Sequence, residues 1–112
     1  MSGELVALVS CPPDKAHEVA SRLVEARLAA CVNVVSGVSS IYRWQGKVTT
    51  DQESLLVIKT NRQIWESFQK MVEEIHPYDV PEIICLPIEM GNKAYLDWLN
   101  NSVALEKTTT DS

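Results

Sequence analysis

The chain has 112 residues, enough for a single domain, and 46% of them are hydrophobic, as in globular proteins. Acidic residues outnumber basic ones, 15 to 10, and the basic residues are scattered, which excludes a nucleic-acid partner. The apolar run from Leu5 to Val9 is far too short to cross a bilayer, and the first residues lack a secretory signal, so we expect no membrane association.

The first predicted element is a strand over this run, because an apolar residue at every position is typical of a strand covered on both faces. The sequence Cys11-Pro12-Pro13-Asp14 ends it, and prolines followed by an acidic residue favour a first helical turn. A helix is predicted to follow, because apolar residues recur every three to four positions at Ala16, Val19, Ala20, Leu23, Val24 and Leu28.

A long β-hairpin is predicted next, with arms over 31–44 and 47–59 joined by the turn Gln45-Gly46. Gly37 predicts a bulge in the first arm. Each arm of about 13 residues reaches roughly 43 Å, at about 3.3 Å per residue, whereas a common strand has about 5–6 residues. We therefore expect the hairpin to overhang the helices that cover the rest of the sheet.

A second helix is predicted after the capping sequence Thr60-Asn61-Arg62-Gln63, and it ends before His76-Pro77. Its expected buried stripe is Ile64, Trp65, Phe68, Met71, Val72 and Ile75. A last strand is predicted over 82–88. A short closing helix is predicted to begin at the cap residue Asn92 and to present Tyr95, Trp98 and Leu99. The tail 104–112 is polar and is expected to be flexible.

The order of these elements, β-α-β-β-α-β plus a short C-terminal helix, predicts an α+β fold of the ferredoxin-like type in one domain, residues 1–103. In that fold the first and third strands are central and the second and fourth are edges. Pro87 agrees, because proline cannot donate to a strand ladder and is tolerated at an edge.

The overhanging hairpin predicts an oligomer. Tyr42 and Trp44 lie two residues apart, hence on one face, and the arms leave open strand edges. Exposed apolar patches and free edges favour aggregation unless they are covered. We expect further copies of the same chain to provide the cover.

Strand directions predict a cluster of metal-ligating residues. We expect the end of the first strand, the start of the second and the start of the fourth to share one rim, which would bring Cys11, Cys31 and the segment from His76 to Glu82 together. Thiol, imidazole and carboxylate groups at one rim favour a soft or borderline divalent ion, Cu²⁺ or Zn²⁺ before Mg²⁺. The three cysteines have no C-x-x-C spacing, which indicates reduced thiols in a cytoplasmic protein.

Several alternatives remain open for these residues. The cysteines can equally be small buried hydrophobes, and His76 can instead contact the last helical carbonyls. The aromatic residues Tyr42, Trp44 and Trp98 can serve packing, and Lys59 can be a solvated strand end or an anion partner. A Cys11 nucleophile with His76 as its base is a third possibility, but no orienting third group follows from the sequence, so we predict no enzyme.

Five sequence blocks resemble the CutA divalent-cation tolerance family. They are Ala29-Ala30-Cys31-Val32-Asn33, Ile41-Tyr42-Arg43-Trp44-Gln45-Gly46-Lys47, Ile58-Lys59-Thr60, His76-Pro77-Tyr78-Asp79-Val80-Pro81-Glu82 and Tyr95-Leu96-Asp97-Trp98. The resemblance runs from residue 4 to about residue 103. It implies a ferredoxin-like homotrimer, assembled as in the PII signalling proteins, that serves the response to divalent cations.

The resemblance also implies a copper-type site and an intersubunit cleft. The family's copper ligands correspond to Cys11 and His76, with Glu82 as a further candidate, whereas Ile75 replaces the first of two adjacent histidines and cannot bind a metal. The alternative function is a PII-like sensor or scaffold that binds a small anion or a protein in the cleft. The expected cleft residues are Tyr42, Trp44, Lys59, Tyr78, Glu82 and Trp98. No Gly-rich phosphate loop is present in the sequence.

Overall fold

Four strands form the sheet, and the computed structural model describes residues 3–103 of the chain. The strands are β1 (Glu4–Cys11), β2 (Cys31–Trp44), β3 (Lys47–Asn61) and β4 (Ile83–Pro87). Their order is β2-β3-β1-β4 and every neighbouring pair is antiparallel. The predicted α+β ferredoxin-like fold, with β1 and β3 central and Pro87 on an edge strand, is confirmed.

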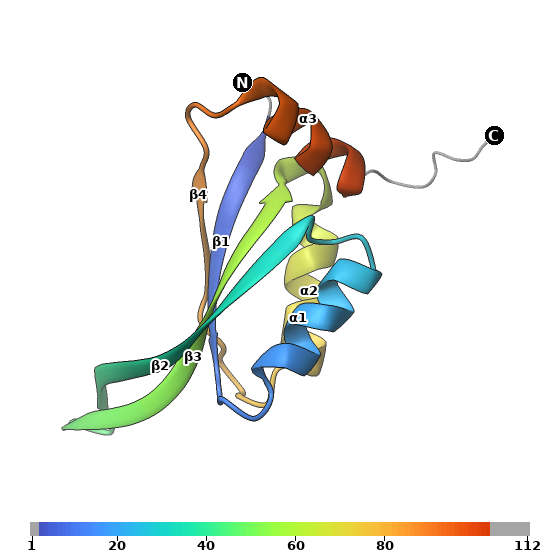
Figure 1. Ribbon diagram of the computed structural model, residues 1–112. Coiled ribbons are helices and arrows are strands. Elements are labelled where there is room, and N and C mark those ends of the chain that lie inside the picture. The colour runs from blue at the N-terminus through green and yellow to red at the C-terminus, as the bar shows by residue number, and fades with distance from the viewer. Residues whose placement is uncertain (1–2, 104–112) are drawn as a thin grey trace.

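The helices lie on one side of the sheet and across one of its ends. They are α1 (Ala16–Glu25), α2 (Trp65–Ile75), preceded by the 3₁₀ turn Arg62–Ile64, and α3 (Lys93–Ser102). In Figure 1, α1 and α2 cover one face, and α3 lies at the end of the sheet where β1 begins. None of the helices within residues 3–103 has the length and apolar character needed to cross a membrane.

The hairpin of β2 and β3 extends well past the two covering helices, as expected (Figure 1). Gln45 and Gly46 both have positive φ, 51° and 78°, which gives the hairpin a turn whose twist matches its strands. The strand register shifts between Val35 and Val38, and Gly37 has φ 74°, which confirms the bulge.

Alternate residues of the central strands build the core between the sheet and the helices. Cys11 and its strand neighbours face the helices together with Phe68 of α2 and Leu23 of α1, and all are fully buried. Leu99 of α3 joins the same core, and the Asn92 side chain accepts a hydrogen bond of 3.0 Å from the Tyr95 N–H, which confirms the predicted cap.

The opposite face of the sheet carries apolar side chains that no helix within residues 3–103 covers. Cross-strand pairing puts on this open face Val6, Leu8, Val35, Leu55, Val57, Ile84 and Leu86. Ile84 and Leu86 are 52% and 57% exposed in the single chain. The sheet therefore has one packed face and one apolar face open to solvent.

The predicted end of the first helix and the predicted cap of the second helix are wrong. The first helix ends at Glu25 rather than Leu28, because Arg27 has φ 60° and the Leu28 N–H turns back to the Leu23 carbonyl at 3.0 Å. Thr60 is not a helix cap, because it lies in β3 and donates its hydroxyl to the Leu28 carbonyl at 2.8 Å. Asn61 caps instead, accepting from the Gln63 N–H at 3.1 Å.

The fourth strand is shorter than predicted, Ile83–Pro87 instead of 82–88. The predicted flexible tail 104–112 lies outside the described residues, so the structure does not test it.

Candidate functional site

His76 closes α2 and turns its ring onto the end of β1. It is 6% exposed, and its Nε2 lies 2.7 Å from the Ser10 carbonyl oxygen. The backbone N–H of Tyr78 donates to Nδ1 at 3.1 Å. Since Nδ1 accepts, it carries no proton, and Nε2 must be the nitrogen that donates to Ser10. Both ring nitrogens are therefore engaged within the protein.

Cys11 follows Ser10, whose carbonyl contacts this histidine, but its own side chain faces the core. Its side chain is fully buried among the residues beneath the helices. Burial, and to a lesser degree the negative charge of Glu53, raise the pKa of the Cys11 thiol to about 11. Because the thiolate is the form that binds a metal or attacks an electrophile, Cys11 is an inert thiol at neutral pH in this arrangement.

Glu82 approaches the same strand from its other side. The Ser10 hydroxyl donates to Glu82 Oε1 at 3.2 Å. Successive side chains of a strand point to opposite faces, so Ser10 and Cys11 direct Glu82 and the thiol to different sides of the sheet. Within residues 3–103, no three His, Cys, Asp or Glu side chains are grouped so that they could hold a metal ion. A single chain does not assemble the predicted set of Cys11, His76 and Glu82.

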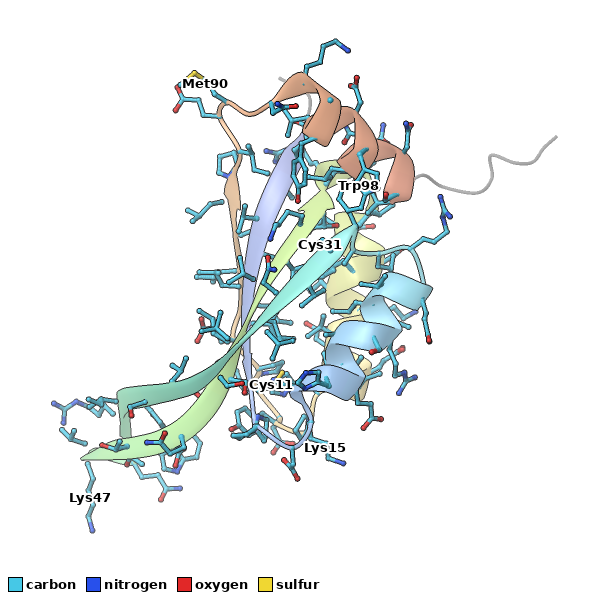
Figure 2. All side chains as sticks on the ribbon, in the orientation of Figure 1. Cys11, Lys15, Cys31, Lys47, Met90 and Trp98 are labelled. Atoms are coloured by element: carbon cyan, nitrogen blue, oxygen red, sulfur yellow. The ribbon has the colours of Figure 1, made fainter. Side chains whose placement is uncertain are left out.

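Cys31 is at the opposite end of the sheet, so its predicted place at this rim is wrong. It pairs with Lys59 of β3, which pairs with Val6 near the start of β1. The crossover through α1 makes β2 parallel to β1, so the two strands begin at the same end of the sheet, with β3 between them. Figure 2 shows Cys11 and Cys31 well apart along the sheet.

Two tyrosines and two carboxylates gather where the hairpin leaves the sheet. Tyr78 donates its hydroxyl to Glu53 Oε2 at 2.9 Å, and Tyr42 donates to Asp51. Burial and the Glu53 hydrogen bond raise the pKa of Tyr78 to about 12, while the Asp51 hydrogen bond raises that of Tyr42. Glu53 is only 6% exposed, so Tyr78 provides a hydrogen bond that a buried carboxylate needs.

Sequence reasoning missed Asp51 and Glu53. A signal for Asp51 was present, because the Gln45-Gly46 turn sets Tyr42 opposite Thr49, and Asp51 is the diagonal neighbour on the same face. The contact of Tyr78 with Glu53 joins residues 25 positions apart and had no local signal.

The remaining predicted cleft residues lie elsewhere in the chain. The Lys59 ammonium donates to the side-chain oxygen of Asn33, at the end of the sheet that carries Cys31. Trp98 is 46% exposed, and its ring lies 5.4 Å from that of Tyr95 on α3. Trp44 is at the hairpin tip. One chain thus distributes the six predicted residues over both ends of the sheet and the hairpin tip.

A shallow groove of about 600 Å³ lies between α1 and the edge strand β2. His17, Glu25 and Asn33 are among the residues that line it, and none of the predicted site residues does.

The geometry argues against Cys11 and His76 as a nucleophile and base. An activated cysteine has a lowered pKa, whereas that of Cys11 is raised. A base needs a free lone pair, and that of His76 Nδ1 already accepts the Tyr78 N–H. The contacts of His76 and Glu82 with Ser10 instead hold the segment after α2 against β1.

Comparisons with known proteins agree with this fold over almost its whole length. The family model "CutA1 divalent ion tolerance protein" matches residues 5–102. The chain is 51% identical to the divalent-cation tolerance protein CutA of Thermus thermophilus over 100 residues, covering 88% of this chain and 97% of that protein. It is 46% identical to mouse protein CutA over 84% of this chain, but spans only 54% of the mouse protein.

Solved structures are equally similar. The Thermus thermophilus CutA1 structure has a TM-score of 0.86 and covers 88% of this chain and 97% of its own. The CutA1 structure from Oryza sativa, 44% identical, has a TM-score of 0.88 and covers 90% of this chain and 94% of its own.

Proposed function

The chain belongs to the CutA1 divalent ion tolerance protein family, and on that premise we propose that it is a trimeric protein that binds a divalent transition-metal ion, copper before others, in the response to such ions. The single observation that carries the assembly is the open apolar face of the sheet. The metal proposal rests on the types of donor group at the end of β1.

The open face supports assembly because exposed apolar surface of this kind is normally covered by a partner. Ile84 and Leu86 on the edge strand β4 are more than half exposed, and Ile41 and Val48 near the hairpin tip are each 69% exposed. A second copy of the chain can cover this surface, because it has the same apolar face, strand edges and hairpin to pack against it. That the oligomer has three subunits is proposed from the family resemblance. The open face by itself indicates only that another chain covers it.

The metal proposal has support and an obstacle. A thiol and an imidazole are donors that copper and zinc prefer, and Cys11 and His76 both lie at the end of β1. As placed, however, these residues do not fit a metal ion, because both His76 nitrogens are hydrogen-bonded and the Cys11 thiol is protonated and buried.

Calorimetric titration of Cu²⁺ into the wild-type protein and Cys11→Ala tests the proposal. We expect saturable binding by wild type that weakens at least tenfold in Cys11→Ala, because one of the few soft ligands is removed. Cys85→Ala is the control, since Cys85 is a free cysteine of the same sheet, although it is only partly buried. Equal affinity in all three proteins would remove Cys11 from the ligand set, and no saturable binding would contradict the metal role.

A second candidate function is a small-anion sensor, and Lys59 favours it. Its ammonium group donates to a neutral amide, Asn33, so that its positive charge is available to an anion in a cleft between subunits. Thermal-shift measurements with phosphate and with carboxylate metabolites, repeated with Lys59→Ala, test this role. Stabilisation of wild type alone supports it, and an absence of any shift in wild type contradicts it.

We also propose a cytoplasmic location. Its support is that Cys11, Cys31 and Cys85 are all free thiols, as is usual in a reducing compartment. Location varies among relatives, since the similar proteins of Oryza sativa and Arabidopsis thaliana are named chloroplastic. Fractionation of cells that express the protein under its own promoter tests the location.

A further inference from the structure

Lys59 places a positive charge on the open apolar face of the sheet. It pairs with Val6 of β1 on one side and with Cys31 of β2 on the other, and directly paired residues point to the same face. Val57 precedes it by two positions in β3 and therefore lies on this face as well. Cys31 marks this end of the sheet in Figure 2. The ammonium group is thus flanked by two apolar side chains and a thiol.

Asn33 adds a second donor group beside the ammonium. It pairs with Val57, so it is the diagonal neighbour of Lys59 on the open face. The Lys59 ammonium donates to Asn33 Oδ1, and because an ammonium group has no lone pair, the amide oxygen must be the atom that faces it. The Nδ2 group is bonded to the same carbon, and within residues 3–103 it makes no hydrogen bond. Two kinds of N–H donor, with one positive charge in total, therefore lie next to each other.

The charges at this end of the sheet fit a ligand that carries a single negative charge. Within the four strands of residues 3–103, the only other basic residues are Arg43 and Lys47, at the hairpin tip. Glu4 lies two residues before the partner of Lys59 in β1, which places a carboxylate on the same face. It is 5% exposed and accepts a hydrogen bond from Asn100 at 2.7 Å. A phosphate group, with a charge of about −1.5 to −2, would meet one cation and a carboxylate there.

We propose that Lys59 and Asn33 bind the carboxylate group of a small monocarboxylate, whose apolar body lies on the open face against Val57 and Val35. The inference rests on the anion-binding role proposed for Lys59 above, and it names the class of anion. One carboxylate oxygen accepts from the Lys59 ammonium and the other from Asn33 Nδ2. The apolar body gains affinity because it removes exposed apolar surface from water, and Val35 is 43% exposed in the single chain.

Recognition depends on both the charge and the two oxygens of the carboxylate. A hydrogen bond between an ammonium and a carboxylate is charge-assisted and therefore stronger than one to a neutral acceptor. A neutral amide of the same shape has only one acceptor oxygen, and its NH₂ group would face the NH₂ group of Asn33 without a lone pair to accept from it. We therefore expect the site to prefer a monocarboxylate to its amide and to phosphate.

The first experiment compares three probes on the wild-type protein. The probes are 3-methylbutanoate, its neutral amide and inorganic phosphate, each titrated at neutral pH and constant ionic strength and followed in ¹H–¹⁵N correlation spectra. We expect 3-methylbutanoate to shift the backbone signals of residues 31–35 saturably. The amide and phosphate should each bind at least tenfold more weakly. An amide that binds as tightly as the carboxylate would overturn the inference, because the charge would then play no part.

The second experiment tests the two residues with variants that keep the fold. Asn33→Asp has nearly the same shape, but it removes the Nδ2 donor and sets a carboxylate against Lys59, so it should weaken 3-methylbutanoate binding at least tenfold. Lys59→Ala should weaken it by a similar factor, because the charge is lost. Lys70→Ala is the matched control, since Lys70 is exposed on α2, and it should bind like wild type. Equal affinity in wild type and Asn33→Asp would overturn the site.

The outcomes separate this inference from the proposed anion-binding role. Saturable phosphate binding that Lys59→Ala abolishes, without binding of 3-methylbutanoate, overturns the monocarboxylate and leaves the role of Lys59 as an anion partner standing. No saturable binding of either anion to wild type overturns both the inference and the anion-binding role.

Discussion

Glu53 influences the chemistry of two neighbouring residues. It is a nearly buried carboxylate, 6% exposed, and its negative charge favours the neutral forms of both Cys11 and Tyr78. Such a group is costly to bury unless it is hydrogen-bonded, and the Tyr78 hydroxyl meets that need at 2.9 Å. The cluster therefore makes folding depend on the protonation of two groups that titrate at alkaline pH.

Stability is expected to fall as the pH rises above about 9. Folding raises the pKa of Cys11 from 9.0 to about 11 and that of Tyr78 from 10.0 to about 12, so the unfolded chain releases both protons at lower pH. The stabilisation is fully present below the unfolded values and is lost as the pH passes through the folded ones. Urea unfolding at several pH values from 7 to about 11.5 measures it.

Tyr78→Phe should flatten the upper part of this dependence, between pH 10.0 and about 12, because phenylalanine has no proton to release. Tyr95→Phe controls for general loss of a tyrosine. A wild-type stability that is constant or rises from pH 9 upward would contradict the raised pKa values of Cys11 and Tyr78, which burial and Glu53 produce together.

At the residue level, the sequence predicted less than at the level of elements. That Cys11 and His76 lie at one rim followed from strand directions. The state of each group did not, because it depends on the backbone carbonyl of Ser10 and on Glu53, which the chain order places far from His76. The burial of Cys11 was likewise not predicted. Its position two residues after Val9, which is buried, nevertheless indicates the helix-covered face.

The hairpin is the element most completely encoded by local sequence. Its turn, its bulge and the bounds of its first arm were predicted, because glycine at positive φ and alternating β-formers are signals that adjacent residues supply. The second arm continues to Asn61, two residues beyond its predicted end. The placement of Cys31 failed for the opposite reason. The crossover through α1 makes β2 run parallel to β1, so its first residue, Cys31, lies at the end of the sheet where β1 begins. The prediction placed Cys31 at the end where β1 finishes.

Two substitutions in the turn should change stability in opposite directions. Gln45 has φ 51°, which asparagine tolerates better, so Gln45→Asn should stabilise by about 0.5 kcal/mol. Gly46 has φ 78° and open space around it, so Gly46→Ala should destabilise by about 1 kcal/mol through backbone strain alone. Urea midpoints measure both. The same sign of change for the two variants would contradict a turn with positive φ at both central residues.

As a single chain, the molecule covers only one face of its sheet within residues 3–103. The continuous apolar run of β1 is typical of a strand covered on both faces, and its residues alternate between the packed face and the open face. Val6 and Leu8 thus indicate a second covering layer, which residues 3–103 of this chain do not provide. The overhanging hairpin in the sequence predicted an oligomer. The open apolar face of the sheet is a second, separate indication that another chain packs on this one.

Multi-angle light scattering during gel filtration at micromolar concentration tests this account most directly. We expect a mass three times that of the 12.5 kDa chain. We also expect Leu86→Glu, on the open face, to lower the mass while Met90→Glu, at a position 82% exposed between β4 and α3, leaves it unchanged. A folded, soluble wild-type species of 12.5 kDa would contradict the account.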